Sequence, residues 1–479
     1  MTTKLLRKEG IFLKQQRTFL LLLTLGLGTV IGTLNITMFN VALPSMMTYF
    51  DAPLATVQWL TSGYMLAAGM IIPAAGFFGD RFGYKRIFCL ALCCVLVFSI
   101  VGALAWCIEL LIVVRFFMGL TGGLLSPLSL AMLYQSLPVS QQAKAASTWG
   151  IANMVGGMMP SVLSGIILSV ADWRFLLLFN LPFVILAIFL TLHLLPKDTL
   201  RSTARLDFTG LALTSMGSLI LLFSFSNLSS WGFSLKLLLG VSLGLACLAA
   251  YIIRSHNRSD TLLNLSVLKF RRYVAALIAG GMNSIALYMI TFLMPLFLQS
   301  GLGVSPLATG MIMLPTSLIA IIIMPVATAF YPKLGEKALM VLGIIILLIG
   351  SAPFLTAVPT TPILLIILAM CVRSCGMGAI NLVSTNAQMS SVPPELSGHA
   401  SSLTNWFHQM LNALIVGIAG NIADLRIAAV PDPTPENLAL AYTSTTNLMM
   451  TVSCLLLLAV IPISLKFFRS KADMRKTVS

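Results

Sequence analysis

Two arginines stand inside long apolar stretches of the sequence with no acidic residue beside them. Arg115 lies in the stretch 109–134 and Arg373 in the stretch 361–386, whereas all 14 Asp and Glu residues fall in polar segments or at stretch ends. A guanidinium in apolar surroundings is costly unless it is hydrogen-bonded or neutralised, so both residues are functional candidates. Two interpretations fit them. Either they bind the carboxylate or phosphate of an anionic ligand bidentately, or carbonyls, neutral side chains and water satisfy them.

One histidine and four amides are further polar groups in apolar stretches. His408, Gln409 and Asn412 share the stretch 398–423, and Asn35 and Asn40 share the stretch 19–43. An imidazole titrates near physiological pH and can carry a proton, although a histidine that packs against a carbonyl fits equally well. Neutral hydrogen-bonding groups also commonly line ligand cavities. With the two arginines, these five residues form our predicted set for a substrate cavity or for ion coupling.

The remaining reactive side chains form no recognised catalytic or metal-ligating pattern. The four histidines include no HExxH motif and accompany no nucleophile arrangement. All eight cysteines lie in or beside apolar stretches, so we expect no disulfide framework and no metal site. We therefore expect no catalytic residues and no cofactor, and an enzyme is disfavoured.

The elements that must position the polar residues are apolar helices. The 479 residues are 58% hydrophobic and 9% charged, and a water-soluble fold of this composition would expose too much apolar surface. Apolar stretches of about 20 residues, long enough to cross a bilayer as helices, recur from end to end. We predict an all-α membrane protein of about fourteen transmembrane helices. They span 19–43, 55–78, 87–106, 109–134, 145–170, 174–195, 208–228, 232–253, 273–299, 306–330, 338–357, 361–386, 398–423 and 440–467.

The net charge of +15 is explained by membrane topology. Most of the 29 Lys and Arg residues fall in the two terminal segments and in the predicted loops on the same side as the termini. By the positive-inside rule this side is cytoplasmic. We therefore predict a multi-pass protein of the cell inner (plasma) membrane with both termini in the cytoplasm, and no nucleic-acid partner.

Two long polar connections, at about 196–207 and 254–272, divide the predicted helices into six, two and six. We predict an N-terminal six-helix bundle at 1–195, a two-helix insert with its linkers at 196–272, and a C-terminal six-helix bundle at 273–479. Two pseudo-symmetric six-helix bundles around a central cavity are the repeat architecture of large secondary carriers. Arg115 and Arg373 then both lie on the fourth helix of a bundle.

The connection after the second predicted helix carries a specific motif. Residues 76–86 read Gly-Phe-Phe-Gly-Asp-Arg-Phe-Gly-Tyr-Lys-Arg, and the residues singled out are Gly76, Asp80, Arg81, Gly83, Lys85 and Arg86. Gly83 permits a tight turn, and Asp80 can pair with a base or cap a neighbouring helix. The segment resembles the signature loop of the major facilitator superfamily. That resemblance implies a conformational latch that holds the outward-facing state.

Further motifs across nearly the whole chain resemble the fourteen-helix drug:proton antiporter branch of that superfamily, of the multidrug efflux type. They are Leu34 to Pro44, Arg115 with Met118 and Gly119, Trp173-Arg174-Phe175, Asn180-Leu181-Pro182, Pro295 to Gln299, Gly303 to Pro306, Gly310, Leu314-Pro315, Val392-Pro393, Gly398 and Ala400-Ser401. In this branch the arginine of helix four has a structural or proton-relay role.

The chain also departs from the branch at three places. Asn35 stands in the segment of helix one where an aspartate is common, and His408 precedes Gln409 where an arginine is common, with Asn412 in place of a glycine. In helix five the antiporter pattern is partly kept. Its surviving residues are Gly156, Gly157, Pro160 and Gly165. They imply close helix packing and a local kink at Pro160.

The resemblance implies a secondary active transporter that exports a small organic compound by alternating access, driven by a proton gradient. We expect a monomer whose partners are the small-molecule substrate and the lipid bilayer. The loss of the helix-one acid leaves an alternative open. In it, the protein exports or exchanges an organic anion, such as a polycarboxylate or siderophore-like metabolite, with weakened coupling to protons.

Overall fold

The computed structural model describes residues 2–136, 156–157, 159–195, 207–232, 234–256, 265–393, 396–430 and 434–470. Regular structure in these residues is helical, apart from one isolated bridge between Gly335 and Ser470. Helices are the expected outcome, because a chain in lipid must satisfy its backbone N–H and C=O groups internally.

The first group of helices runs from the N-terminus to Leu194. Its elements are α1 (Thr2–Thr37), η1 (Met38–Val41), α2 (Leu43–Phe50), α3 (Leu54–Val57), α4 (Trp59–Ile71), η2 (Ile72–Ala74), α5 (Ala75–Phe82), α6 (Tyr84–Ala103), α7 (Ile108–Ser136), α9 (Pro160–Val170), α10 (Arg174–Leu178) and α11 (Leu181–Leu194). The second predicted helix is interrupted by the 3-10 turn η2, where Pro73 cannot donate a helical hydrogen bond.

The insert and the second group of helices follow. The insert consists of α12 (Phe208–Ser226), α13 (Leu228–Trp231) and α14 (Leu235–His256). After the short η3 (Leu265–Lys269) come α15 (Arg271–Leu296), the π-helical turn η4 (Phe297–Gly301), α16 (Pro306–Leu334), α17 (Glu336–Leu355), α18 (Ile363–Met389), α19 (Ser397–Ala428) and α20 (Pro435–Phe467).

Within the described residues, 13 helical segments are long and apolar enough to cross a membrane. They correspond to thirteen of the fourteen predicted helices. Of the predicted helix 145–170, residues 145–155 lie outside the described part of the chain, and α9 contributes its last eleven residues. The prediction of an all-α membrane protein with two bundles and an insert is confirmed.

Several helix ends differ from the predicted ones. The first helix begins at Thr2, far before residue 19, because a polar N-terminal segment can continue a helix beyond the apolar stretch. At the other end of the chain α19 continues to Ala428, five residues past the predicted end. That extension places Asp424 on α19, beyond the predicted helix end at residue 423.

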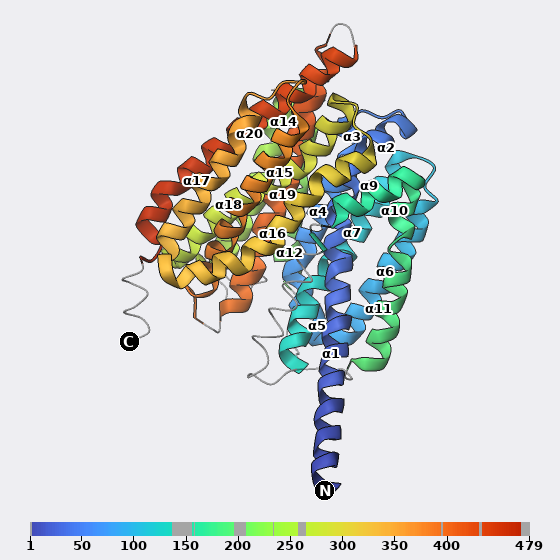
Figure 1. The fold of residues 1–479 in the computed structure, drawn as a ribbon, viewed down its shortest axis with the longest axis vertical. Helices are drawn as coiled ribbons and strands as arrows, with labels where there is room; N and C mark the ends of the chain where they lie inside the picture. Colours follow the sequence, from blue (N-terminus) through green and yellow to red (C-terminus); the bar gives the residue numbers. More distant parts are fainter. Residues whose placement is uncertain are drawn as a thin grey trace.

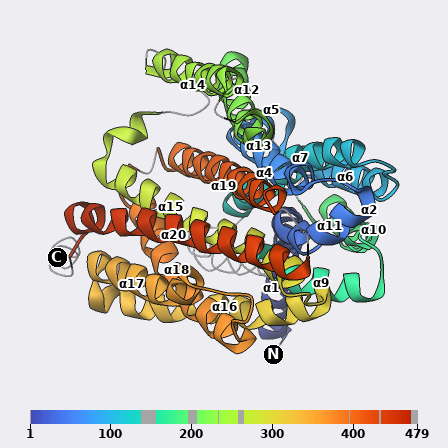
Figure 2. The same ribbon diagram turned by 90° about the horizontal axis from the view of Figure 1, so that it is seen from above.

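The two groups of helices meet along several pairs of elements. In Figure 1 they approach each other at the upper end and diverge toward the end that carries both termini. The pairs in contact include α4 with α19, α9 with α16, and η1 with α15. The insert lies to one side, as Figure 2 shows, where α12 packs against α4 and α19. The domain boundaries at residues 195 and 272 stay predictions.

The contacting surfaces share one apolar core. It includes Phe39 from η1, Leu66 from α4, Phe292 from α15 and Ala413 from α19, each with no exposed surface. Separate clusters fill the interior of each group of helices. The two groups are therefore packed directly on each other at the end away from the termini.

Candidate transport site

Arg115 is completely buried on α7 and is held by the backbone of two other helices. Its Nε donates to the carbonyl of Leu60 on α4 at 3.0 Å, and its Nη2 donates to the carbonyl of Asn35 on α1 at 2.7 Å. The guanidinium carbon also lies 4.2 Å and 4.4 Å from the ring centroids of Phe39 and Tyr64. Carbonyl oxygens and aromatic faces are both favourable partners for a desolvated cation.

Arg373 is bound in a related way on α18. It is 1% exposed, its Nη1 donates to the hydroxyl of Ser351 on α17, and its Nη2 donates to the carbonyl of Ala286 on α15 at 3.1 Å. Gly350 makes room for this contact, since a methyl group there would lie 2.5 Å from the backbone nitrogen of Arg373. Each arginine thus donates to a carbonyl on the first helix of its own bundle.

This geometry favours the structural interpretation of the arginines. Both guanidinium groups are buried and turned to protein oxygens within their own bundle, with no carboxylate among their described hydrogen-bond partners. The described ion pairs all lie elsewhere, at Arg174–Asp172, Arg254–Asp207 and Arg272–Glu336. Among the described residues, no contact places the two arginines around one anion.

The two asparagines of the first helix have different surroundings. The Asn35 side chain accepts a hydrogen bond from Asn180, between α10 and α11, at 3.3 Å, while its carbonyl binds Arg115. Asn40 accepts from Thr61 at 3.0 Å and donates across to the carbonyl of Thr291 on α15 at 3.3 Å. Asn35 therefore belongs to the arginine site, and Asn40 to the contact between bundles.

The predicted polar residues of α19 lie on two faces. His408 packs on α15, with its Nε2 3.4 Å from the Leu277 carbonyl, and Asn412 accepts a hydrogen bond from Ser284 of α15 at 2.7 Å. Gln409 lies against α4 of the other bundle, since a methyl group on Gly69 would come 2.9 Å from its Cβ. Gln409 is thus the member of this trio at the contact between bundles.

Two residues outside our predicted set also join the bundles at the end away from the termini. Asp424 on α19 accepts a hydrogen bond from the backbone nitrogen of Ala55 on α3 at 3.2 Å. Gln299 donates to the carbonyl of Val41 at 2.9 Å. Sequence reasoning missed Asp424 because the predicted helix ends one residue before it. Gln299 carried a usable signal, since it lies in a quoted family motif.

Helix five supports the same contact through small residues. Gly165 on α9 faces α16, where a methyl group would lie 2.6 Å from the Pro306 carbonyl. Gly156 packs on α1, where a methyl group would overlap with Thr33 Oγ1, whereas Gly157 has open space. Pro160 starts α9 at its first turn, where a proline is well tolerated. The predicted kink involves residue 158, which lies outside the described residues.

The signature loop binds within its own bundle in this structure. Gly83 adopts a φ of 99°, and across this turn Tyr84 donates to Asp80 at 3.0 Å. Lys85 donates to the carbonyls of Leu192 and Leu195 at the end of α11, both at 2.8 Å. Within the same loop, Gly76 has open space beside it, Arg81 lies near the rings of Phe77 and Phe82, and Arg86 is in the first turn of α6.

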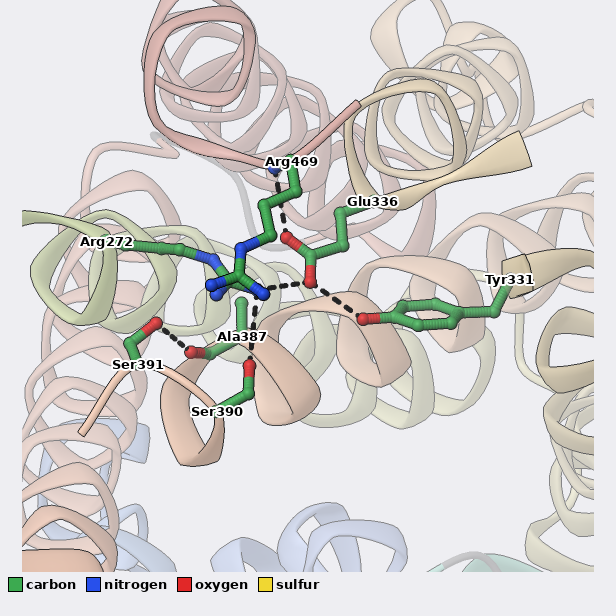
Figure 3. Close-up of polar contacts among 7 residues, drawn as sticks. All are labelled: Arg272, Tyr331, Glu336, Ala387, Ser390, Ser391 and Arg469. Atoms are coloured by element: carbon green, nitrogen blue, oxygen red, sulfur yellow. Dashed lines mark hydrogen bonds and ion pairs between the residues drawn. The ribbon is translucent and has the colours of Figure 1, made fainter. Parts of the chain in front are cut away.

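The corresponding turn of the second bundle is built around Glu336. Gly335 has a φ of 83°, and Glu336 is 2% exposed at the start of α17. Its carboxylate accepts from Tyr331 at 2.8 Å, from the backbone nitrogen of Arg469 at 3.1 Å and from Arg272 (Figure 3). One carboxylate therefore links the ends of four helices, α15, α16, α17 and α20.

Both turns contain a tyrosine that donates to a carboxylate, but the two residues follow each other in opposite order along the chain. In the first bundle the acid Asp80 precedes the glycine and Tyr84 follows it, whereas in the second Tyr331 precedes the glycine and Glu336 follows it. Both turns also tie helix three to the end of helix six, through Lys85 in the first bundle and through the backbone of Lys337 and Arg469 in the second.

The profile of the Major Facilitator Superfamily matches residues 25–416. The chain belongs to this superfamily. YhcA of Bacillus subtilis, an uncharacterized MFS-type transporter, is 26% identical over 442 residues, which cover 90% of this chain and 83% of YhcA. The multidrug resistance protein B homolog of Mycobacterium tuberculosis is 29% identical over 382 residues, or 79% of this chain and 71% of the homolog. A D-xylose-proton symporter superposes with a TM-score of 0.67 at 15% identity over 95% of this chain and 98% of its own.

Superfamily membership confirms the resemblance drawn from the sequence motifs. The chain is a multi-pass membrane protein, and its family and the matched solved structure are transporters. The roles of the individual site residues stay predictions. What the structure adds is that the predicted residues do not form one site, because they divide among two buried arginine sites, the packing of α19 on α15, and the contact between the superfamily's two bundles.

Proposed function

We propose that this protein exports small organic compounds by alternating access of the space between its two bundles. The observation that carries the proposal is the nature of the contact at the end away from the termini. There the bundles are joined by separable hydrogen bonds, Asn40 to Thr291, Gln299 to Val41 and Ala55 to Asp424. Such bonds exchange readily for bonds to water, because each contributes only about 1 kcal/mol net.

The signature loop supports a second state with the other end closed. Asp80 is held by Tyr84 of the same bundle while the far end is packed together. Rocking that separates Asn40 from Thr291 brings the termini-side ends of the bundles toward each other. Asp80 can then exchange its tyrosine partner for a donor on the second bundle, which is the predicted latch of the outward-facing state.

Export of organic compounds is supported by the names of relatives, among them the multidrug resistance protein B homolog. The basic residues of the termini-side loops support a location in the cell inner (plasma) membrane with both termini in the cytoplasm. In this orientation the packed end faces outward, and the structure corresponds to an inward-facing state.

We assign proton coupling to His408. Its Nε2 is 3.4 Å from the Leu277 carbonyl, which can accept a hydrogen bond from the ring N–H, so that a proton can be taken up at the other ring nitrogen, Nδ1. The proposal includes no cofactor, and the proton gradient supplies the driving force.

Transport by purified protein in liposomes tests both the export of organic compounds and the assignment of proton coupling to His408. The panel contains cationic, neutral and anionic compounds, each measured with and without an imposed pH gradient. We expect uptake of cationic and neutral compounds that the gradient accelerates. The variant His408→Gln should keep exchange without a gradient and lose the acceleration. Gradient-driven transport by His408→Gln would contradict the coupling assignment, and selective transport of anions would favour the organic-anion alternative.

A further inference from the structure

An apolar pocket lies between the insert and the line where the two bundles meet. It has a volume of about 150 Å³ and is lined by Leu66 of α4, Leu222 of α12, Leu248 of α14, and Trp406 and Leu414 of α19. Because α4 and α19 belong to different bundles, the pocket wall includes both sides of their contact, and the insert covers it from outside.

The insert and α19 contact each other directly on either side of the pocket. On one side Asn421 donates to the carbonyl of Ser226 at 2.8 Å. On the other side Tyr251 of α14 and Leu403 of α19 belong to one apolar cluster, against which Trp406 packs. A lipid acyl chain extends through half of a hydrocarbon core of about 30 Å. The space between these two contacts is too short for such a chain.

The chemistry of the lining suits an uncharged ring. Its side chains are leucines, aromatic rings, a methionine, an alanine and Ser218, whose hydroxyl already donates to the carbonyl of Thr214 at 2.7 Å. The Nε1 of Trp406 is buried and has no hydrogen-bond partner among the described residues. A cavity of roughly 150 Å³ lined by Leu, Ile and Phe stays dry and binds benzene.

One side chain separates this pocket from the contact between the bundles. Met410 lines the pocket, and its Cε occupies the space that a methyl group on Gly69 of α4 would take. The preceding residue, Gln409, contacts the same glycine. Methionine has a flexible, unbranched side chain that adapts to neighbouring groups. We therefore expect that, once the bundles separate at Gly69, a rotation of Met410 joins the pocket to the space between them.

We propose that this pocket binds an aryl group of the transported compound, which moves between the pocket and the space between the bundles past Met410. The inference rests on the proposed export function, because it assigns a substrate class to that function. It restricts the apolar part of the substrate to about one ring, and it gives the two inserted helices a role in binding.

Binding is tested first, without transport, on the full-length protein in lipid nanodiscs. Bromobenzene is the probe, since its bromine quenches the fluorescence of an adjacent indole. We expect saturable quenching in the parent protein, the same quenching in Met216→Phe, and its loss in Trp406→Phe and Ser218→Phe. Met216 and Ser218 both lie on α12, but Met216 is 50% exposed and does not line the pocket. Linear quenching that is equal in all four proteins would overturn the proposal.

A second arm uses nanodiscs whose lipids carry brominated acyl chains. If a lipid tail occupied the pocket, Trp406 would already be quenched there and bromobenzene would add nothing, which would also overturn the proposal.

A third arm compares export of aryl and non-aryl compounds. Ser218→Phe should slow aryl export at least tenfold and leave non-aryl export unchanged, and Met216→Phe should export both classes at the parental rate. Saturable binding without export of any compound by the parent would contradict the proposed function alone, and equal slowing of both compound classes would contradict the pocket assignment.

Discussion

At the scale of the residue, the buried arginines act as braces between helices. Arg115 joins α7 to α1 and α4, and Arg373 joins α18 to α15 and α17. The carbonyls of Leu60 and Ala286 lie inside helices, so the arginine adds a second bond to a spare lone pair there, whereas Asn35 lies in the last turn of α1, where carbonyls lack a helical partner. This arrangement lets a cation remain in an apolar interior without a carboxylate.

Replacement of either arginine should therefore affect every substrate alike. In Arg115→Gln and Arg373→Gln we expect a loss of stability of about 1–3 kcal/mol, the usual cost of breaking buried hydrogen bonds. Transport of anionic and cationic compounds should fall by the same factor once the amount of folded protein is matched. Thermal unfolding monitored in detergent and liposome transport provide the measurements. A loss confined to anions would restore the anion-binding interpretation.

The negative charge of Glu336 should stabilise the fold of the second bundle. Glu336→Gln keeps an acceptor for Tyr331 but leaves the largely buried guanidinium of Arg272 without its carboxylate. Because breaking such a pair leaves an uncompensated charge, we expect destabilisation of about 3 kcal/mol. The neighbouring exposed residue provides a matched control, and Arg271→Gln should unfold at the parental temperature. Equal unfolding temperatures for Glu336→Gln and the parent would refute the proposed linking role.

At the scale of the element, glycines decide how closely α9 and α16 approach. Gly165 and Gly310 face each other, and a methyl group on Gly310 would lie 3.0 Å from the Ser161 carbonyl. Backbone atoms cannot move aside as a flexible side chain can. The packed end of the molecule therefore depends on these two positions.

Gly165→Ala should shift the protein toward the state in which the end away from the termini is open. A methyl group 2.6 Å from the Pro306 carbonyl must push the helices apart. Distances between spin labels on α9 and α16, measured by electron–electron resonance, should lengthen by several ångströms. Gly157→Ala provides the control, because no atom of the described residues lies within 4 Å of the position that its methyl group would take. A distance distribution unchanged in Gly165→Ala would contradict the prediction.

The sequence predicted thirteen helices that the described residues show, with their approximate limits, because apolar length is a local property. It also singled out Arg115 and Arg373, since a charge in an apolar stretch is visible in the sequence. It could not predict their partners, because the carbonyls of Asn35 and Ala286 are backbone groups that any sequence provides. It missed the contact of Asp424 with Ala55, which depends on where a helix ends and on which conformational state the protein occupies.

At the scale of the whole molecule, the charge distribution predicts orientation. A fluorescent protein fused after Ser479 should be fluorescent in intact cells, because the basic loops retain that side in the cytoplasm. Labelling uses a thiol reagent that cannot cross the membrane and a variant without other cysteines. The reagent should not label a cysteine introduced at Lys337. It should label a cysteine introduced at Trp106, which is 80% exposed near the opposite end. The reverse labelling pattern would invert the proposed orientation.

The placement of the arginines has an electrical consequence. Arg115 lies about two turns from the start of α7 and Arg373 about three turns from the start of α18, and both helices run from the same end of the molecule. One charge moved through the full membrane potential changes the energy by about 2.3 kcal/mol per 100 mV. Because each guanidinium is fixed to its own bundle at similar depth, rocking carries little charge through the field. Membrane voltage should therefore act on the charges of the cargo and the proton, and the empty carrier should return at a rate that voltage scarcely changes.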